Sequence, residues 1–588
     1  MFLVLSSDLK MWNIENTAEI LLLGEWCRTQ ETNKILANRP FKIVPYHWLK
    51  KRKVIEDTIF LKKTYEKWIP LIAEQLNVIH TTAYSTSYWE VMIGPWFSKF
   101  LCAVFDKYKC IKNAIDTNNI SNVLIYQYRD HELVPNDLDQ YVEFSHEEPW
   151  NTYIFTLLIH FLKNIPYQEI ENFNYNQGSL ESSIKEKSKL KFKYFINAIY
   201  YFFSKRKTGL FIYGNKLNLF ERALMQVLCK QAIFLKKEIV YKLTFNADSS
   251  LRKKLFFSYQ NEFENFLAYL LPIQIPKCYL EGYQSYQQFI KNKFPKEAKI
   301  ILISEWIYGD EAFKIWLAQM KEKGAKLYLE QHGGCYGISQ LSISEYYELR
   351  VADKYLTWGW KSGQYANKLC PCPSIKLSKI KRKIKTNQSN NGKVLLTLVE
   401  QARYTVHVDD RGILGPNFLD YIKNISALLD QLEEMLQGNF HIKLYPAERG
   451  WEMKTRLAKH KNNFLPHDMD LYTALNHSAL HVSTYNGTTF LETFTANYPT
   501  LLYWPESMAS IRNSAKQPFD ELEKLGILHR DSISLGNKLS EVKNNIQEWW
   551  RDNDRQYFLK EFCKSFALSD DKYFSILRKE LKKDLLEL

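Results

Sequence analysis

The most chemically suggestive segment of the sequence is a histidine followed by two glycines, at the end of a short apolar run. Residues 326–330 predict a β-strand, and the turn after it contains Gln331, His332, Gly333 and Gly334. Glycines let a backbone approach a ligand closely, and a histidine at a strand end can act as a general base or contact a phosphate. The alternative is a structural turn in which His332 bonds a nearby carbonyl. We predict that this turn binds a ligand and that His332 is catalytic.

A second segment combines small hydroxyl side chains with a glycine at the start of a predicted helix. Residues 480–483 predict a buried strand, a helix follows near 489–496, and a strand at 500–503 would complete a β-α-β unit. Helix N-terminal amides bind phosphate, and Glu492, about one turn into the helix, could reach a ribose hydroxyl. An ordinary helix cap is the alternative. The predicted nucleotide-binding residues are Ser483, Thr484, Tyr485, Asn486, Gly487, Thr488, Thr489 and Glu492.

Charged side chains lie within or just after two further predicted strands, at residues 393–399 and 441–445. Ligands of open α/β sheets bind at the carboxyl ends of the strands, so these side chains should line the same cleft. Cations there would stabilise a bound diphosphate, and a carboxylate could serve as a second candidate base. The cations are Arg403, Lys443 and Arg449, the carboxylate is Glu400, and Tyr445 accompanies them.

Three short patterns could suggest a metal, and each is weak. Residues 137–139 and 468–470 each hold two aspartates one residue apart, but both fall in polar loops. Cys370 and Cys372 have no second pair and no nearby histidine, which makes a poor zinc site. The sequence also lacks a P-loop and a G-x-G-x-x-G motif. We therefore predict no metal and no cofactor.

The elements that must position these residues alternate between short apolar, β-branched runs and helical stretches. This pattern predicts parallel strands covered by helices. The alternation stops at residues 376–392, a lysine-rich and polar stretch typical of a linker, and then restarts. We predict an α/β fold with two Rossmann-like domains facing across a cleft. The first, residues 1–375, has a large helical elaboration, the second spans 393–560, and a helical tail covers 561–588.

The same pattern predicts further strands and helices. Strands are expected at 19–27, 41–46, 122–128, 209–214, 299–305 and 355–358, in addition to those above. Helices are expected at 55–77, 89–108, 153–164, 219–234, 310–323, 417–436, 451–459 and 471–476.

Composition indicates a folded protein that prefers anionic partners. The chain has 588 residues, and its 79 basic and 65 acidic side chains give a net charge of 79 − 65 = +14. This favours nucleotides, nucleic acid or an anionic membrane surface. Nine scattered cysteines fit a reducing compartment better than a disulfide framework. We expect no secretory signal and no spanning helix, and we interpret residues 194–203 as a core helix with basic ends.

In combination, these motifs resemble a family of transferases from bacterial loci for O-antigen and other surface polysaccharides. The resemblance covers most of the chain and includes residues 21–27, 44–48, 88–96, 105–108, 331–334, 355–359, 443–446 and 483–492. It implies a GT-B glycosyltransferase that works without a metal, with the donor held mainly by the C-terminal domain and the acceptor by the N-terminal one. One departure is visible at residues 49–52, where an acidic residue and an arginine are expected and Leu-Lys-Lys-Arg stands instead. This departure puts activity or acceptor choice in question.

The leading hypothesis is a cytoplasmic glycosyltransferase, peripheral to the inner face of the membrane, with a nucleotide-sugar donor and a lipid-linked glycan acceptor. Lysines at 185–193, at 205–207 and in the linker would attract an anionic membrane surface. A near alternative is transfer of a polyol phosphate from an activated nucleotide. Another is a catalytically silent scaffold in polysaccharide assembly. Nucleic-acid binding is disfavoured because the basic residues do not alternate with aromatic ones on one face.

Overall fold

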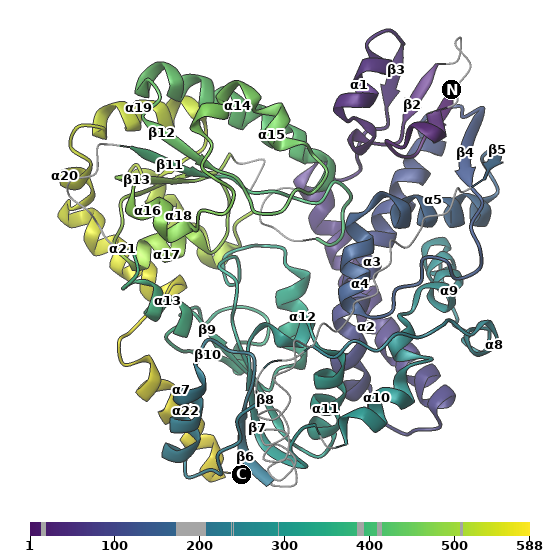
Figure 1. Cartoon of the computed structure of the whole chain (residues 1–588), viewed down its shortest axis with the longest axis horizontal. Helices are drawn as coiled ribbons and strands as arrows, with labels where there is room; N and C mark the ends of the chain where they lie inside the picture. Colours follow the sequence, from purple (N-terminus) through teal and green to yellow (C-terminus); the bar gives the residue numbers. More distant parts are fainter. Residues whose placement is uncertain are drawn as a thin grey trace, which may run out of the picture.

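Three five-stranded parallel sheets follow one another along the chain in the computed structural model (Figure 1). The structure describes residues 1–12, 19–171, 207–236, 238, 240–291, 293–384, 393–408, 414–505 and 510–587. The helix predicted at 194–203 and the lysines at 185–193 lie outside these residues. The α/β prediction is confirmed. Residues 1–375, predicted to form one Rossmann-like domain, hold two of the sheets rather than one.

The first sheet has the order β3-β2-β1-β4-β5. Its central strand, β1, is formed by the apolar residues at the very start of the sequence, and it pairs with β2 and β4. The sequence analysis did not predict β1 or β5, which have three and four residues. The strands are β1 (Phe2–Val4), β2 (Ile20–Leu22), β3 (Phe41–Ile43), β4 (Asn122–Tyr126) and β5 (Tyr167–Ile170).

Two long helices, α2 (Lys51–His80) and α3 (Thr86–Thr117), form the centre of the helical elaboration. Helix α3 begins where the Ser85 side chain accepts a hydrogen bond from the Tyr88 amide. It is buried around most of its circumference, because α2, α5 (Glu148–Leu162), α11 (Glu311–Glu322) and α12 (Ile343–Val351) all pack against it. The other helices of this region are α1 (Gln30–Leu36), α4 (Leu138–His146) and α5 (Glu148–Leu162).

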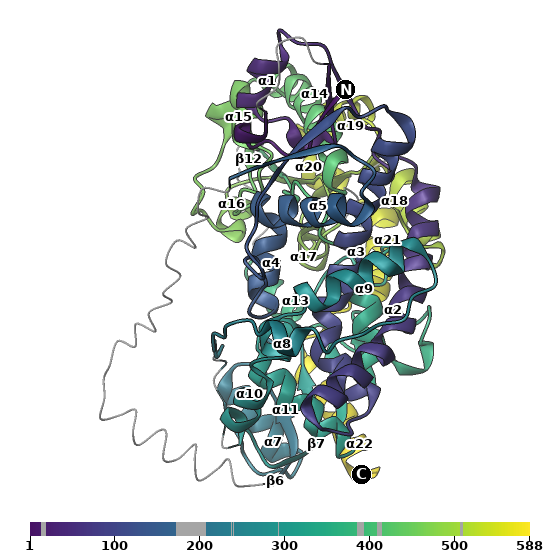
Figure 2. The same ribbon diagram turned by 90° about the vertical axis from the view of Figure 1, so that its right-hand side faces the viewer.

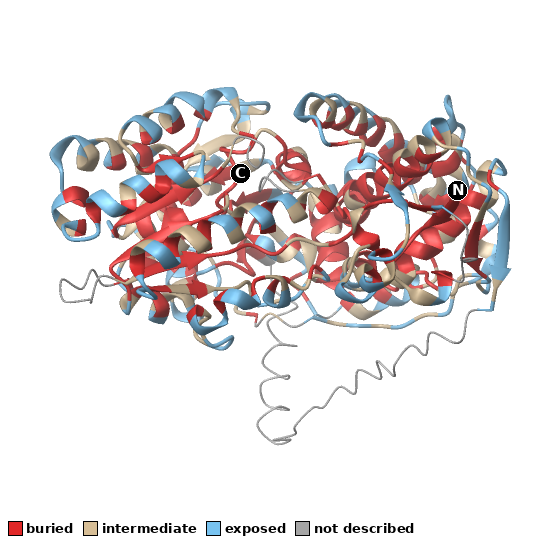
Figure 3. Ribbon diagram, turned by 90° about the horizontal axis from the view of Figure 1, so that it is seen from above, coloured by how far each residue is buried: buried red, intermediate tan, exposed pale blue. Residues whose placement is uncertain are grey.

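The second sheet has the order β10-β9-β8-β7-β6, and four of the five residues of β8 are buried. In the molecule as a whole, buried strands lie among helices that expose their outer faces (Figure 3). Strand β8 spans the predicted residues, whereas the three-residue edge strand β10 was not predicted. The strands are β6 (Lys207–Ile212), β7 (Glu297–Ile303), β8 (Lys326–Glu330), β9 (Lys354–Thr357) and β10 (Leu369–Pro371). The helices are α7 (Leu219–Leu228), α8 (Ser249–Arg252), α9 (Glu262–Gln274), α10 (Tyr283–Ile290), α11 (Glu311–Glu322) and α12 (Ile343–Val351).

The third sheet has the order β12-β11-β13-β14-β15. Its helix α14 buries Ile425, Leu428, Leu429 and Leu432, whose spacing places them on one face. The strands are β11 (Val394–Thr397), β12 (Phe440–Lys443), β13 (Leu480–Ser483), β14 (Thr500–Tyr503) and β15 (Leu528–His529). The helices are α14 (Phe418–Leu436), α15 (Met453–Arg456), α16 (Leu471–Asn476), α17 (Thr489–Thr495), α18 (Asn513–Lys524) and α19 (Ser532–Val542).

The C-terminal helices α20 (Ile546–Trp550), α21 (Asn553–Phe566) and α22 (Tyr573–Glu587) return the chain to the second sheet. Helix α21 packs on α17, and α22 packs on α7 and α13 (Ile375–Ile380) (Figures 1 and 2). Leu577 and Leu581 of α22 are buried in a cluster with apolar residues of β6, β7 and β9. The second and third sheets, bridged in this way, form a GT-B-like pair of Rossmann-like units.

The predicted linker begins as a packed helix. Helix α13 (Ile375–Ile380) buries Leu377 and Ile380, and its two lysines are half-buried. Lys379 pairs with Glu221 of α7 at 2.5 Å. Residues 385–392 lie outside the described part of the chain.

Within the described residues, no helix is both long enough and apolar enough to cross a membrane.

The aromatic core along α3 gives a test of the fold. Trp96 is fully buried, and its ring stacks on Phe100 at 4.8 Å and meets Tyr141 edge-on. Trp96→Ala should lower the free energy of unfolding by about 3–5 kcal/mol, because it removes a large side chain from a packed site. Trp96→Phe should cost less, since the indole N–H it removes has no hydrogen-bond partner among the described residues. Equal urea midpoints for the two variants would contradict this packing.

Candidate functional site

The turns that follow β8 and β13 meet directly. The Gly334 amide donates a hydrogen bond to the Thr488 hydroxyl at 3.1 Å, which joins the second sheet to the third. A side chain at Gly334 would have no room, because a Cβ atom there would lie 2.5 Å from the Gly487 carbonyl oxygen. Asn486 adds a second contact by donating to the Ser339 hydroxyl at 2.9 Å. The two segments that the sequence analysis singled out therefore form one site.

A cavity of about 530 Å³ lies beside this contact. Its size is typical of a site for a small organic ligand. Both Rossmann-like units line it, and α3 and α4 close it from the N-terminal region. The lining residues are Lys99, Leu138, Val142, Tyr308, His332, Gly333, Gly334, Cys335, Tyr336, Ser344, Lys376, His407, Tyr445, Leu471, Tyr472, Tyr485, Gly487, Thr488, Thr489 and Glu492.

His332 faces this cavity from a fixed position. Its Nε2 lies 2.9 Å from the Oε1 of Glu348, a fully buried carboxylate on α12. The hydroxyls of Tyr308, Tyr336 and Tyr355 donate to the same carboxylate at 2.7, 2.8 and 2.8 Å. This network holds the imidazole in one orientation and satisfies the buried charge.

The Glu348 network also sets the protonation of His332. Burial lowers the pKa of His332, but the charge and hydrogen bond of Glu348 outweigh it, and the pKa rises above the usual 6.5. For Glu348, burial raises the pKa, and the bonds from His332 and the tyrosines bring it below its usual range. The pair therefore favours an imidazolium beside a carboxylate, which places a cation at the cavity wall.

Two lysines and three tyrosines complete the polar lining. Lys99 of α3 lies over the Tyr308 ring at 5.5 Å. Lys376 of α13 pairs with Glu492 at 2.8 Å, which fixes that carboxylate at the wall. Tyr445, Tyr472 and Tyr485 also line the cavity, and a tyrosine ring can pack on a flat ligand group.

Four of the predicted binding residues hold the turns instead of lining the cavity. The Gln331 carboxamide accepts from the Trp358 amide at 2.9 Å and donates to the Gly333 carbonyl at 2.8 Å. Thr484 donates to the Thr397 carbonyl at 2.8 Å. Ser483 and Asn486 are buried beside it, and Ser483 donates to the Tyr485 carbonyl.

Two of the predicted cations point elsewhere. Lys443 donates to the Met469 carbonyl at 2.5 Å and lies outside the cavity lining. Arg403 pairs at 2.6 Å with Glu148, at the start of α5, so it joins the third sheet to the N-terminal region. Neither side chain is placed to contact a phosphate in this cavity.

Glu400 and Arg449 line a second, smaller cavity of about 70 Å³, which shares Tyr445 and His407 with the larger one. Burial, assisted by the charge of Glu448, raises the pKa of Glu400 to about 8. A carboxyl with that pKa is mostly protonated at neutral pH. Glu400 is therefore suited to donate a proton rather than to accept one.

Sequence reasoning missed Glu348, Tyr308, Lys99 and Lys376. Tyr308 precedes the histidine turn and Glu348 follows it by many residues. Only tertiary packing brings Glu348 of α12 and Tyr308, just before α11, to His332. Lys376 was assigned to a solvated linker. A helix at 89–108, within α3, was predicted from the sequence, but which of its faces meets the site was not.

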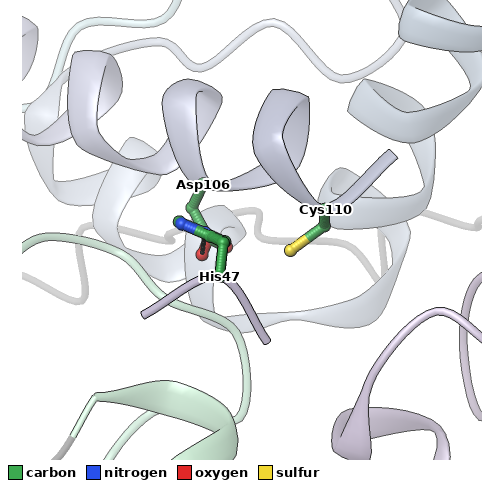
Figure 4. A group of neighbouring side chains, drawn as sticks. All are labelled: His47, Asp106 and Cys110. Carbon is green, nitrogen blue, oxygen red and sulfur yellow. Dashed lines mark hydrogen bonds and ion pairs between the residues drawn. The ribbon is translucent and has the colours of Figure 1, made fainter. Parts of the chain in front are cut away.

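A separate group with metal-ligand chemistry lies between α3 and the loop after β3. Asp106 and Cys110 project from α3 toward His47 (Figure 4), and one ligand atom from each residue lies within 4.8 Å of the other two. Asp106 already accepts from the Tyr46 hydroxyl at 2.7 Å and bonds His47 Nε2 at 3.0 Å. The adjacent Lys107 is buried, so its charge would oppose a metal ion. The group is best described as a hydrogen-bonded His–Asp pair.

The sequence departure at residues 49–52 lies away from the cavity. Leu49 is exposed, and the exposed Arg52 pairs with Glu56 one turn along α2. None of these side chains lines the larger cavity.

The model of the LIC12162 family transferase matches residues 1–581. The chain belongs to this family. Both turns, the cavity and the Glu348 network lie within the matched residues, and the expected membership of a transferase family is confirmed. The comparison with curated proteins gave no match.

Several solved structures show a distant likeness to this family member. S. aureus MnaA in complex with UDP is 12% identical, with a TM-score of 0.37, over 64% of this chain and 97% of that one. Anabaena HepE with UDP and glucose is 12% identical, with a TM-score of 0.30, over 64% and 99%. The wall teichoic acid polymerase TagF is 12% identical, with a TM-score of 0.29, over 53% and 77%. The GT-B-like description rests on this chain's own sheets and the cavity between them.

Gly334→Ala tests the contact between the two turns. The added methyl group meets the backbone of Gly487 and Thr488, so the variant should lose about 1–3 kcal/mol of stability in thermal unfolding. Gly333→Ala is the matched control, because the nearest atom to its Cβ is 3.9 Å away. A Gly334→Ala variant as stable as the control would show that the turns do not meet in solution.

Glu348→Gln tests the origin of the His332 protonation. With the carboxylate charge removed, burial dominates, and the pKa of His332 measured by NMR on histidine-labelled protein should fall below its wild-type value. Glu305 raises the same pKa less, so Glu305→Gln should give a smaller fall. The idea fails if the two substitutions shift the pKa equally.

Proposed function

We propose that this transferase moves a sugar from a nucleoside diphosphate donor to a glycan acceptor. The observation that carries the proposal is the cavity between two Rossmann-like units, lined by fixed cations and tyrosines. A diphosphate needs cations and hydrogen-bond donors, and a nucleobase needs a ring on which to stack. This one cavity offers both kinds of partner.

In the proposed complex, the donor phosphates lie in the cavity beside the contact between the two turns. His332, as imidazolium, and Lys99 contact the leaving phosphate, and the amides at 487–489 add hydrogen bonds. Glu492, held by Lys376, takes the ribose hydroxyls, and Tyr445, Tyr472 or Tyr485 stacks on the base. Preorganised cations of this kind lower the barrier as negative charge develops on the leaving group.

The acceptor is assigned to the side of the cavity formed by the N-terminal region. Leu138 and Val142 of α4 line that side with apolar surface. We propose a lipid-linked or surface-polysaccharide glycan as the acceptor, reached by a cytoplasmic enzyme peripheral to the inner face of the membrane. The net charge of +14 supports contact with an anionic leaflet.

A ligand screen tests the donor assignment. Nucleoside diphosphates should raise the unfolding temperature of the purified chain, by the equivalent of about 2.7 kcal/mol at 100 times their dissociation constant. His332→Ala and Lys99→Ala should weaken diphosphate binding on the order of 10-fold each, while leaving binding of the uncharged nucleoside unchanged. Lys423→Ala, on the exposed face of α14, is the control.

These binding measurements, together with turnover assays, also distinguish the alternative functions. If His332→Ala reduces turnover but leaves diphosphate affinity intact, His332 acts as a base and not as a phosphate contact. Release of a nucleoside monophosphate from the active donor would mark transfer of a polyol phosphate instead of a sugar. A chain that binds none of the nucleotides would support the scaffold interpretation.

A further inference from the structure

Helix α7 (Leu219–Leu228) differs from an ordinary surface helix because it buries polar side chains and exposes apolar ones. Such helices direct apolar residues to the core and polar ones to water. In α7, Arg222 and Gln226 are buried at 5% and 0% exposure, whereas Phe220 and Val227 are exposed at 74% and 50%. Leu219, Leu224 and Leu228 are exposed beside them.

Hydrogen bonds of the buried polar residues fix this orientation. Arg222 donates to the Asn215 and Leu217 carbonyls at 3.0 Å each and pairs with Glu238. Gln226 donates to the Leu210 carbonyl at 2.9 Å and accepts from the Phe234 amide at 3.0 Å. Rotating the helix to hide its apolar face would break all of these bonds, so the exposure is built into the fold.

Exposed basic side chains lie at the end of α7 and on the helix that packs against it. Lys230 lies just past the end of the helix and is exposed. Helix α22 packs on α7 (Figure 1). Its Lys579 and Lys583 are exposed. Glu221, the acidic residue of α7, is engaged internally, because it bonds Lys379 and Tyr573. The face therefore combines apolar residues with a cationic border.

The same face is connected to the candidate site. Helix α7 follows β6 at the carboxyl edge of the second sheet, the edge that carries the His332 turn. Lys216, just before α7, pairs with Glu305 at 2.9 Å, and the charges of both act on His332. A surface that docks on α7 would thus lie at the edge of the sheet where the reaction is proposed to occur.

We propose that α7 docks this protein on an anionic lipid bilayer. Phe220, Leu224 and Val227 enter the boundary between headgroups and acyl chains, and Lys230, Lys579 and Lys583 contact anionic headgroups. Charge complementarity favours a membrane over a neutral apolar partner. The inference rests on the proposed lipid-linked acceptor and adds the surface through which the enzyme would reach it.

Vesicle sedimentation of the full chain tests this. Wild-type protein should bind vesicles containing phosphatidylglycerol more tightly than vesicles of phosphatidylcholine alone, and high salt should weaken the difference. Phe220→Ser combined with Val227→Ser should reduce binding roughly 10- to 100-fold. Phe256→Ser is the matched control, because Phe256 is equally exposed, at 78%, outside α7. Lys579→Glu with Lys583→Glu should reduce binding to the anionic vesicles alone.

Three results would overturn the proposal. The first is unchanged vesicle binding by the Phe220/Val227 variant. The second is a wild-type dimer that this variant dissociates, which would assign the face to a second copy. The third is a large fall in unfolding temperature, which would show that the chain itself covers the face. Nucleotide binding in the absence of vesicles should be the same in the wild type and in all variants. A wild-type protein that binds vesicles but no nucleotide would count against the donor assignment alone.

Discussion

The buried carboxylate of Glu348 is the interaction on which the candidate site depends. A charge without solvent is costly unless several donors surround it. Here the donors come from the segment before α11, the turn after β8, and β9, so satisfying one carboxylate fixes the relative positions of those segments and of α12. It also fixes the orientation and protonation of His332. The position of the histidine turn is therefore a consequence of core electrostatics as much as of loop sequence.

The next constraint is the close approach of the two turns. Gly334 can touch the backbone of Gly487 and Thr488 because it lacks a Cβ atom. This contact, with the return of α22 to the second sheet, limits how far the two Rossmann-like units can separate. The cavity beside it is closed from a third direction by α3 and α4, so the N-terminal region takes part in the site rather than only supporting it.

Much of the fold could be predicted from local patterns in the sequence, whereas much of the site could not. The runs that became β8, β13 and β14 were visible because buried parallel strands are continuously apolar. The strands β1, β10 and β15 were missed because two or three residues carry no periodicity. The turns after β8 and β13 were identified from their glycines and hydroxyls. However, Gln331, Ser483 and Thr484 hold those turns, while Lys99, Tyr308 and Glu348 were not predicted. The residue types of a turn indicate that it belongs to a site. Only tertiary packing decides which of its side chains faces the ligand.

The return of α22 has a consequence for how the protein is made. The apolar face of the second sheet, including Leu210, Leu302 and Leu356, is covered by Leu577 and Leu581, from the last residues of the chain. At typical rates of synthesis, the interval between the first of these strands and its cover is roughly tens of seconds. During that time the apolar face of the second sheet stays uncovered in the nascent chain. We expect chaperones to hold this intermediate, and we expect the cell to eliminate C-terminally truncated chains rapidly.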